Sequence, residues 1–144
     1  VYAAKGQNFA KTMLRLAKER TELKVVNDQV GAPTGAELLA DITAHLMIKA
    51  ATNPDVHGTY HVAASGETSW WEYARFVIET ARALGVTLQV QPDGVKPLST
   101  SEYPTPAKRP KNSRLDTRKL VSATRLVLPD WRQGVARLVE EGEL

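Results

Sequence analysis

Residues 23–37, with the sequence LKVVNDQVGAPTGAE, decide the fold. The short apolar run Leu23–Val26 predicts a strand, and the turn-forming residues after it predict a loop. Thr34 and Glu37 stand three positions apart, which is the spacing of a capping box and predicts the start of a helix. A strand, a loop and a helix in this order favour an α/β fold.

Amphipathic helices are predicted on both sides of this stretch. Residues 8–20 place Phe9, Met13, Leu16 and Ala17 on one face, with Asn8 as the N-cap. Other helices are predicted from Thr34 to about residue 52, from a second capping box at Ser69 and Glu72 to Gly85, from Asp116 to Leu120, and over 129–141. Strands are predicted over 58–63 and 86–90, whereas five prolines predict an irregular segment over 91–110.

Composition excludes several classes of protein. The chain has 144 residues, enough for one domain. Without cysteine it has no disulfide, thiolate nucleophile or cysteine metal site, which is compatible with a cytoplasmic protein. The sequence has no apolar run long enough to predict a transmembrane helix. The net charge of +3 suits an anionic ligand but is too small to indicate nucleic acid. The chain opens on Val1 rather than Met, which predicts a fragment.

The sequence lacks the motifs of several catalytic and cofactor sites. It has no G-x-G-x-x-G fingerprint to hold a dinucleotide pyrophosphate. Short-chain dehydrogenases use a Tyr with a Lys four positions later, which lowers the pKa of the Tyr. The residues four positions after the tyrosines here are Gly6, Ala64, Val77 and Ala107. We therefore predict no catalytic residue in this chain.

Four stretches indicate a family. They are residues 5–9 (KGQNF), 26–34 (VNDQVGAPT), 60–70 (YHVAASGETSW) and 105–116 (TPAKRPKNSRLD). In order and spacing they resemble the C-terminal half of the dTDP-4-dehydrorhamnose reductases, which are extended short-chain dehydrogenases. One stretch alone would be a weak indication of the family, but the four in this order are specific for it. The resemblance covers essentially the whole chain.

The resemblance implies a fold and an activity. Residues 1–144 would form the C-terminal portion of an extended Rossmann-type dehydrogenase: edge strands and helices plus a small substrate-binding subdomain. An NADPH-binding Rossmann domain, absent from this chain, would carry the fingerprint and the Tyr/Lys dyad. The full enzyme would reduce the C4 ketone of dTDP-4-dehydro-L-rhamnose in dTDP-rhamnose biosynthesis, which supplies O-antigen. This chain alone would bind the dTDP-sugar without catalysing its reduction.

Arg109 is the first candidate binding residue. A guanidinium can hold a diphosphate in bidentate fashion, and Arg109 lies in the proline-rich loop. The resemblance also implies an Arg that contacts the nucleotide diphosphate in this region. The alternative is a solvated charge within a basic run. Asn112 could add a hydrogen bond to the ligand, or it could cap a local turn.

Two further groups of candidates lie nearer the N-terminus. Gln29, Gly31 and Thr34 follow a strand, where ligands bind at the edge of a parallel sheet. Gln29 could read an amide or hydroxyl, and Gly31 would allow close approach of the backbone, but capping alone accounts for Thr34. The resemblance places Asn8 and Phe9 near the substrate, the alternative being an N-cap and a core aromatic residue. Of the neighbouring pair Trp70 and Trp71, we expect one in the core rather than stacked on a base.

Glu37 and Glu141 are candidate metal ligands. The resemblance implies that some relatives form a homodimer in which glutamates bind Mg²⁺, a cation that prefers carboxylate oxygen. The alternatives are a capping role for Glu37 and a solvated helix end for Glu141.

Two other functions stay open at the level of sequence. One is a non-catalytic homologue, like the regulatory subunit of methionine adenosyltransferase. The upstream sequence would separate it from a reductase, because the reductase needs the Tyr/Lys dyad. The other is a basic interaction domain, which calorimetry with dTDP would separate from both.

Overall fold

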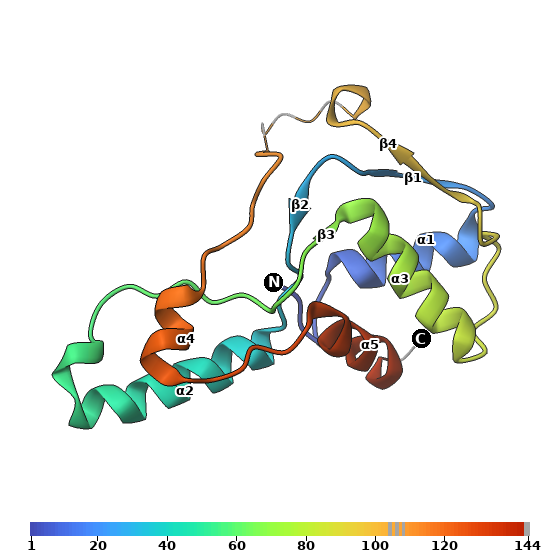
Figure 1. Ribbon diagram of the computed structural model, residues 1–144. Helices are drawn as coiled ribbons and strands as arrows, with labels where there is room; N and C mark the ends of the chain where they lie inside the picture. Colours follow the sequence, from blue (N-terminus) through green and yellow to red (C-terminus); the bar gives the residue numbers. More distant parts are fainter. Residues whose placement is uncertain (104, 106, 108, 143–144) are drawn as a thin grey trace.

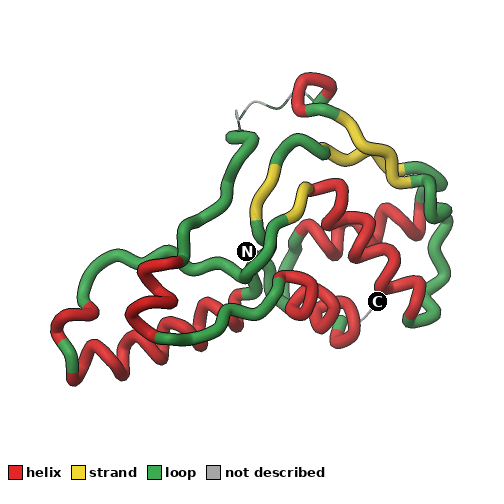
Figure 2. Tube along the Cα trace, viewed as in Figure 1, coloured by secondary structure: helices red, strands yellow, loops and turns green. Residues whose placement is uncertain are grey.

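The computed structural model describes residues 1–103, 105, 107 and 109–142. Figure 2 shows that helices make up most of its regular structure. Figure 1 labels the elements in chain order: α1 (Phe9–Glu19), β1 (Leu23–Val26), β2 (Val30–Gly31), α2 (Ala36–Thr52), a 3-10 turn η1 (Pro54–Val56), β3 (Thr68–Ser69), α3 (Trp70–Ala83), β4 (Val95–Leu98), a 3-10 turn η2 (Thr100–Glu102), α4 (Arg118–Thr124) and α5 (Trp131–Glu141).

We call the larger, compact part of the molecule the body. It consists of α1, α3 and α5 with the β1–β4 sheet, and α3 lies between the other two helices (Figure 1). Strands β1 and β4 pair in parallel, with Leu23 opposite Val95 and Val26 opposite Leu98. The fully buried side chains of the body include Val77, Ile78, Val90, Trp131, Val135 and Val139. The predicted α/β fold is confirmed.

The helices of the body begin where the sequence predicts. Asn8 caps α1 by accepting the Lys11 N–H at 3.0 Å. At α3 both halves of the capping box form, since Ser69 Oγ accepts the Glu72 N–H and Glu72 accepts the Ser69 N–H. Gly85 follows α3 with a φ of +85°, a conformation that suits glycine. Leu84, the C-cap of α3, is half exposed.

We call the second part the arm. It consists of α2, η1 and α4 and projects away from the body at the left of Figure 1. Ile42, Leu120 and Leu128 form its buried cluster. On the apolar face of α2, Ile42 is buried, and the remaining apolar residues are half-buried: Leu38, Leu39, Leu46 and Ala50.

The capping box predicted at Thr34 and Glu37 is wrong. Gly35 is the N-cap of α2, and no side chain completes the cap. Thr34 is buried, and its hydroxyl accepts the N–H of Ala64 at 3.1 Å and donates to the Ala32 carbonyl at 3.0 Å. A buried N–H without a partner is costly, so this distant contact outweighs the local cap.

Two predicted strands do not form. Residues 58–63 are extended but unpaired, and Tyr60 and Val62 pack against the buried cluster of the arm. Residues 86–90 instead bind the end of α1, because the N–H groups of Gln89 and Val90 both donate to the Ala17 carbonyl. Val90 is nevertheless fully buried, in a cluster with residues of α1, α3, β1 and β4.

Strand β4 lies inside the segment that we predicted to be irregular, although Pro97 is part of it. The carbonyls of Gly94 and Leu98 accept hydrogen bonds from the N–H groups of Leu23 and Asn27. The backbone N–H and C=O groups of the even-numbered residues of β4 therefore point toward β1. Pro97 is therefore at a position whose missing N–H would point away from β1. Within the described sheet β4 is an edge strand, where proline is tolerated.

Candidate functional site

The segment that follows the proline-rich loop lies beside β2. The Val30 N–H donates to the Lys111 carbonyl and the Ser113 N–H to the Val30 carbonyl, each at 2.8 Å. Two stretches some eighty residues apart in the chain thus form one surface, because residues 111–113 continue the β2–β3 pair on its open side. This pairing brings the predicted loop of Gln29 next to the loop of Arg109.

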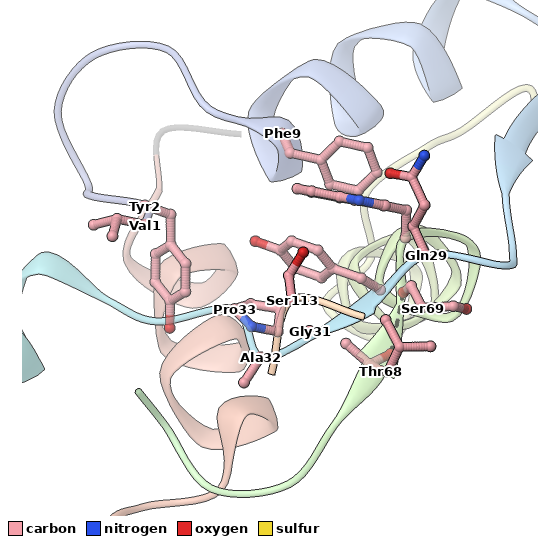
Figure 3. Close-up of a pocket in the computed structure, with 13 residues that line it drawn as sticks. Val1, Tyr2, Phe9, Gln29, Gly31, Ala32, Pro33, Thr68, Ser69 and Ser113 are labelled. Atoms are coloured by element: carbon pink, nitrogen blue, oxygen red, sulfur yellow. Dashed lines mark hydrogen bonds between the residues drawn. The ribbon is translucent and has the colours of Figure 1, made fainter. Parts of the chain in front are cut away.

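A cavity of about 210 Å³ opens at this surface (Figure 3). In Figure 3, Phe9 and Gln29 lie on one side of it and Gly31 and Pro33 on the other. Its walls come from the N-terminus, α1, the β1–β2 loop, β2, β3 and the start of α3. The lining residues are Val1, Tyr2, Phe9, Gln29, Val30, Gly31, Ala32, Pro33, Thr68, Ser69, Trp70, Tyr73 and Ser113.

A second cavity, of about 380 Å³, shares Phe9, Gln29 and Trp70 with the first. It lies along β1 and reaches the proline-rich segment. Its lining residues are Phe9, Met13, Lys24, Val25, Val26, Gln29, Trp70, Tyr103, Thr105 and Arg109. Because three residues line both cavities, the two cavities are neighbours.

Aromatic rings lie where the two cavities adjoin, since Phe9 and Trp70 line both. The centroid of the Phe9 ring lies 4.7 Å from that of Trp70 and 5.1 Å from that of Tyr73. Trp70 is partly exposed, whereas the Trp71 indole N–H donates to the Val95 carbonyl at 2.8 Å. The expectation that one Trp of the pair has a structural role therefore holds for Trp71.

Tyr73, in the first turn of α3, also lines the first cavity. It is 3% exposed, and within the described residues its hydroxyl has no hydrogen-bond partner. Burial, with a smaller contribution from the nearby Tyr2, raises the pKa of Tyr73 above its usual value. A buried hydroxyl without a partner at a cavity wall is suited to a polar group of a ligand.

The predicted binding residues fall into two groups. Phe9 and Gln29 line both cavities, Gly31 the first and Arg109 the second. A Cβ atom at Gly31 would lie 3.7 Å from the Ser113 Cβ, an ordinary contact, so the backbone itself does not require glycine there.

The other three predicted binding residues do not line either cavity. Asn8 caps α1 and donates to the Ala3 carbonyl, and Thr34 holds Ala64 as described above. Asn112 accepts from the backbone N–H of Arg114 at 3.1 Å and from its guanidinium at 2.9 Å. Its neighbour Ser113 lines the first cavity instead.

The basic residues around Arg109 differ in their surroundings. Lys111 Nζ lies 3.0 Å from a carboxylate oxygen of Asp28, and Arg114 pairs with Glu67 at 2.6 Å. Arg109 is exposed at the larger cavity. The remaining basic residue of the run, Lys108, lies outside the described residues.

The carboxylates of Glu37 and Glu141 both pair with the guanidinium of Arg137. Arg137 lies 3.4 Å from Glu37 and 2.8 Å from Glu141, measured between guanidinium nitrogen and carboxylate oxygen. All three side chains are more than half exposed. Among the described residues, no cluster of three or more acidic or histidine side chains is arranged to hold a metal ion.

Lining residues that sequence reasoning missed include Met13, Lys24, Tyr103 and Thr105. The signal for Lys24 was its alternation with buried neighbours in the predicted strand. Tyr103 lies within the proline-rich segment, where an aromatic residue could have been noted. In the part of the chain that the structure covers, no helix is long and apolar enough to cross a bilayer.

A family model described as the RmlD substrate binding domain matches residues 1–144. The chain belongs to the RmlD substrate-binding domain family. The dTDP-4-dehydrorhamnose reductase of Escherichia coli (strain K12) is 59% identical over 141 residues, which make up 98% of this chain and 46% of that relative. The resemblance found in the four sequence stretches is therefore confirmed.

Solved structures of relatives share the fold of this family member. The structure of a dTDP-4-dehydrorhamnose reductase from Clostridium acetobutylicum matches with a TM-score of 0.79 at 32% identity, over 94% of this chain and 44% of that one. The reductase from Bacillus anthracis, solved in complex with NADP, matches with a TM-score of 0.77 at 38% identity, over 97% and 45%. The chain spans about half the length of the curated relatives it matches.

Proposed function

We propose that the full-length protein containing this chain is a cytoplasmic dTDP-4-dehydrorhamnose reductase, which reduces the C4 ketone of dTDP-4-dehydro-L-rhamnose with NADPH. This chain supplies the wall of the active site that binds the dTDP-sugar. One observation carries the proposal: two neighbouring cavities share Phe9, Gln29 and Trp70, and the larger is also lined by Arg109, in a chain of the RmlD substrate-binding family.

The larger cavity suits the nucleoside diphosphate. Phe9, Trp70 and Tyr103 offer aromatic surface to a base, since base–aromatic stacking contributes about 1–3 kcal/mol. Arg109 in the same cavity can hold the diphosphate with two parallel hydrogen bonds. The smaller cavity, with the hydroxyls of Ser113 and Tyr73, suits the deoxyhexose.

The cofactor belongs to the other half of the enzyme. This chain carries neither a dinucleotide fingerprint nor a Tyr followed four positions later by Lys. NADPH would therefore be held by the Rossmann domain, and would deliver the hydride to a sugar that this chain keeps in place. We expect this chain alone to bind dTDP weakly and to have no reductase activity, because half of the site is missing.

The test is steady-state kinetics of the full-length protein with its Arg109→Ala variant. We expect the KM for the dTDP-sugar to rise about 10- to 100-fold, because a hydrogen bond to a charged group contributes about 1.5–3 kcal/mol. Arg114→Ala is the matched control, since Arg114 pairs with Glu67 and lines neither cavity. An Arg109→Ala enzyme with an unchanged KM would contradict the assignment. Tight dTDP binding without turnover in the wild type would favour the non-catalytic homologue.

We also propose that Glu37 and Glu141 bind Mg²⁺ between two copies of the full-length protein. Both exposed carboxylates pair with the Arg137 guanidinium, so Mg²⁺ would have to displace that guanidinium to bind them. Mg²⁺ commonly takes one or two carboxylates and keeps water in its other positions. Sedimentation of the full-length protein should show a dimer with Mg²⁺ and a monomer with EDTA. The Glu37→Gln variant should be monomeric in both, and a dimer mass that EDTA leaves unchanged would count against the metal site.

A further inference from the structure

The orientation of the Gln29 amide is set by a chain of hydrogen bonds. Asp28 Oδ1 accepts from the backbone N–H of Thr100 at 2.8 Å and from the Thr100 hydroxyl at 2.6 Å. The Gln29 side-chain nitrogen in turn donates to the same Thr100 hydroxyl oxygen, at 3.1 Å. This chain joins the β1–β2 loop to η2, which stands more than seventy positions later.

The direction of each bond follows from the number of protons available. The hydrogen bonds from Thr100 and the nearby Lys111 lower the pKa of Asp28 to about 2, so its carboxylate only accepts. The single proton of the Thr100 hydroxyl is thereby committed to Asp28. The Thr100 oxygen can then only accept from Gln29, which must turn its NH₂ group toward Thr100.

The amide oxygen of Gln29 is consequently left for the cavities. In Figure 3 this oxygen lies on the side of Phe9, and the nitrogen points away from it. Gln29 is 9% exposed and lines both cavities. In such a shielded place a ligand that presents an acceptor to the Gln29 oxygen would leave both groups unpaired, which is costly.

We propose that the Asp28–Thr100 pair fixes Gln29 as a hydrogen-bond acceptor that reads the imide N–H of thymine. The proposal rests on the proposed function and names the part of the nucleotide that Gln29 recognises. A sugar hydroxyl both donates and accepts, so either orientation of the amide would serve it. An imide N–H only donates, and the fixed orientation therefore distinguishes thymine from cytosine, whose ring nitrogen at the same place is an acceptor.

The experiment is calorimetry of the full-length protein with dTDP and with 5-methyl-dCDP, which keeps the methyl group of thymine but lacks the imide proton. We expect the wild type to prefer dTDP at least about tenfold, in line with the contribution of one well-placed hydrogen bond. Thr100→Val removes the hydroxyl that orients Gln29 and should bring the preference close to one. Thr100→Ser keeps the hydroxyl and should keep the preference.

Two further variants separate recognition from folding. Lys111→Gln removes the ion pair with Asp28 but leaves its carboxylate, and should retain the preference for dTDP. If Thr100→Val does not fold, Gln29→Leu should remove the preference by deleting the acceptor itself. A Thr100→Val protein that binds both nucleotides more weakly in the same ratio would overturn the inference alone, as would a wild type that binds both equally. A wild type that binds neither would overturn the proposed function as well.

Discussion

The body and the arm are built from similar helices, but they bury them to different extents. In the body, α3 is covered on two sides by α1 and α5 and on a third by β1 and β4. In the arm, α2 and α4 share a cluster of three buried residues. Met47 and Ile48 on α2 are 68% and 73% exposed. Long helices thus do not by themselves make a stable core, and the arm should be the less stable region.

The largest expected effect is in the body, from Trp131→Ala. Trp131 is 2% exposed, and its ring centroid lies 5.1 Å from that of Phe76 and 5.9 Å from that of Tyr73. Removal should lower the free energy of unfolding by about 3–5 kcal/mol, measured by urea denaturation. Trp131→Phe should lose less, because an aromatic ring is retained. A loss below about 1 kcal/mol for the Ala variant would show that the body does not depend on this cluster.

A smaller effect is expected in the arm, from Leu120→Ala. Leu120 is fully buried, but it has few buried neighbours, so the surroundings can collapse into the space it leaves. We expect a loss of about 2 kcal/mol, at the low end for a Leu→Ala change. Hydrogen exchange should rise in α2 and α4 and stay unchanged in α3. The control is Ile48→Ala, an exposed position of the same region. Equal acceleration in α3 would contradict the independence of the arm.

The smallest effect concerns how the helices begin. Ser69 caps α3 and also donates to Asn27 Oδ1 at 2.9 Å, whereas Gly35 starts α2 without a side-chain bond. Ser69→Ala should cost about 1 kcal/mol in thermal or urea unfolding. Ser69→Thr keeps the hydroxyl and should cost less. If the Ala variant were as stable as the wild type, the better capping of the body would not contribute to the difference between the two regions.

Helices were predictable here because their signals are local. Asn8, Ser69 and Gly85 each act on residues within one turn, and their predicted roles are confirmed. The strand Leu23–Val26 was also predictable from its local apolar run, and it is confirmed as β1. Strand β4 was not predictable, because it is defined by pairing with β1 some seventy residues earlier and Pro97 argued against a strand. The capping role predicted for Thr34 was wrong for the same reason: Thr34 instead accepts the N–H of Ala64, which is thirty positions away in the sequence.

The site shows the same division. Phe9, Gln29 and Arg109 were identified from the motifs in which they stand, and the structure brings them to neighbouring cavities. The contact of Asp28 with Thr100 could not be read from the sequence, since neither residue belongs to a pattern that points to the other. The buried Tyr73 hydroxyl, which has no partner among the described residues, is visible only in three dimensions.

Proline in β4 has a consequence for the behaviour of the protein in solution. The outer edge of a sheet presents N–H and C=O groups that can recruit a strand from another molecule and start aggregation. At Pro97 the outward N–H is missing, and Lys96 next to it keeps a charge at the surface. Pro97, which made β4 hard to predict, therefore also disfavours pairing of this edge strand with another copy of the chain.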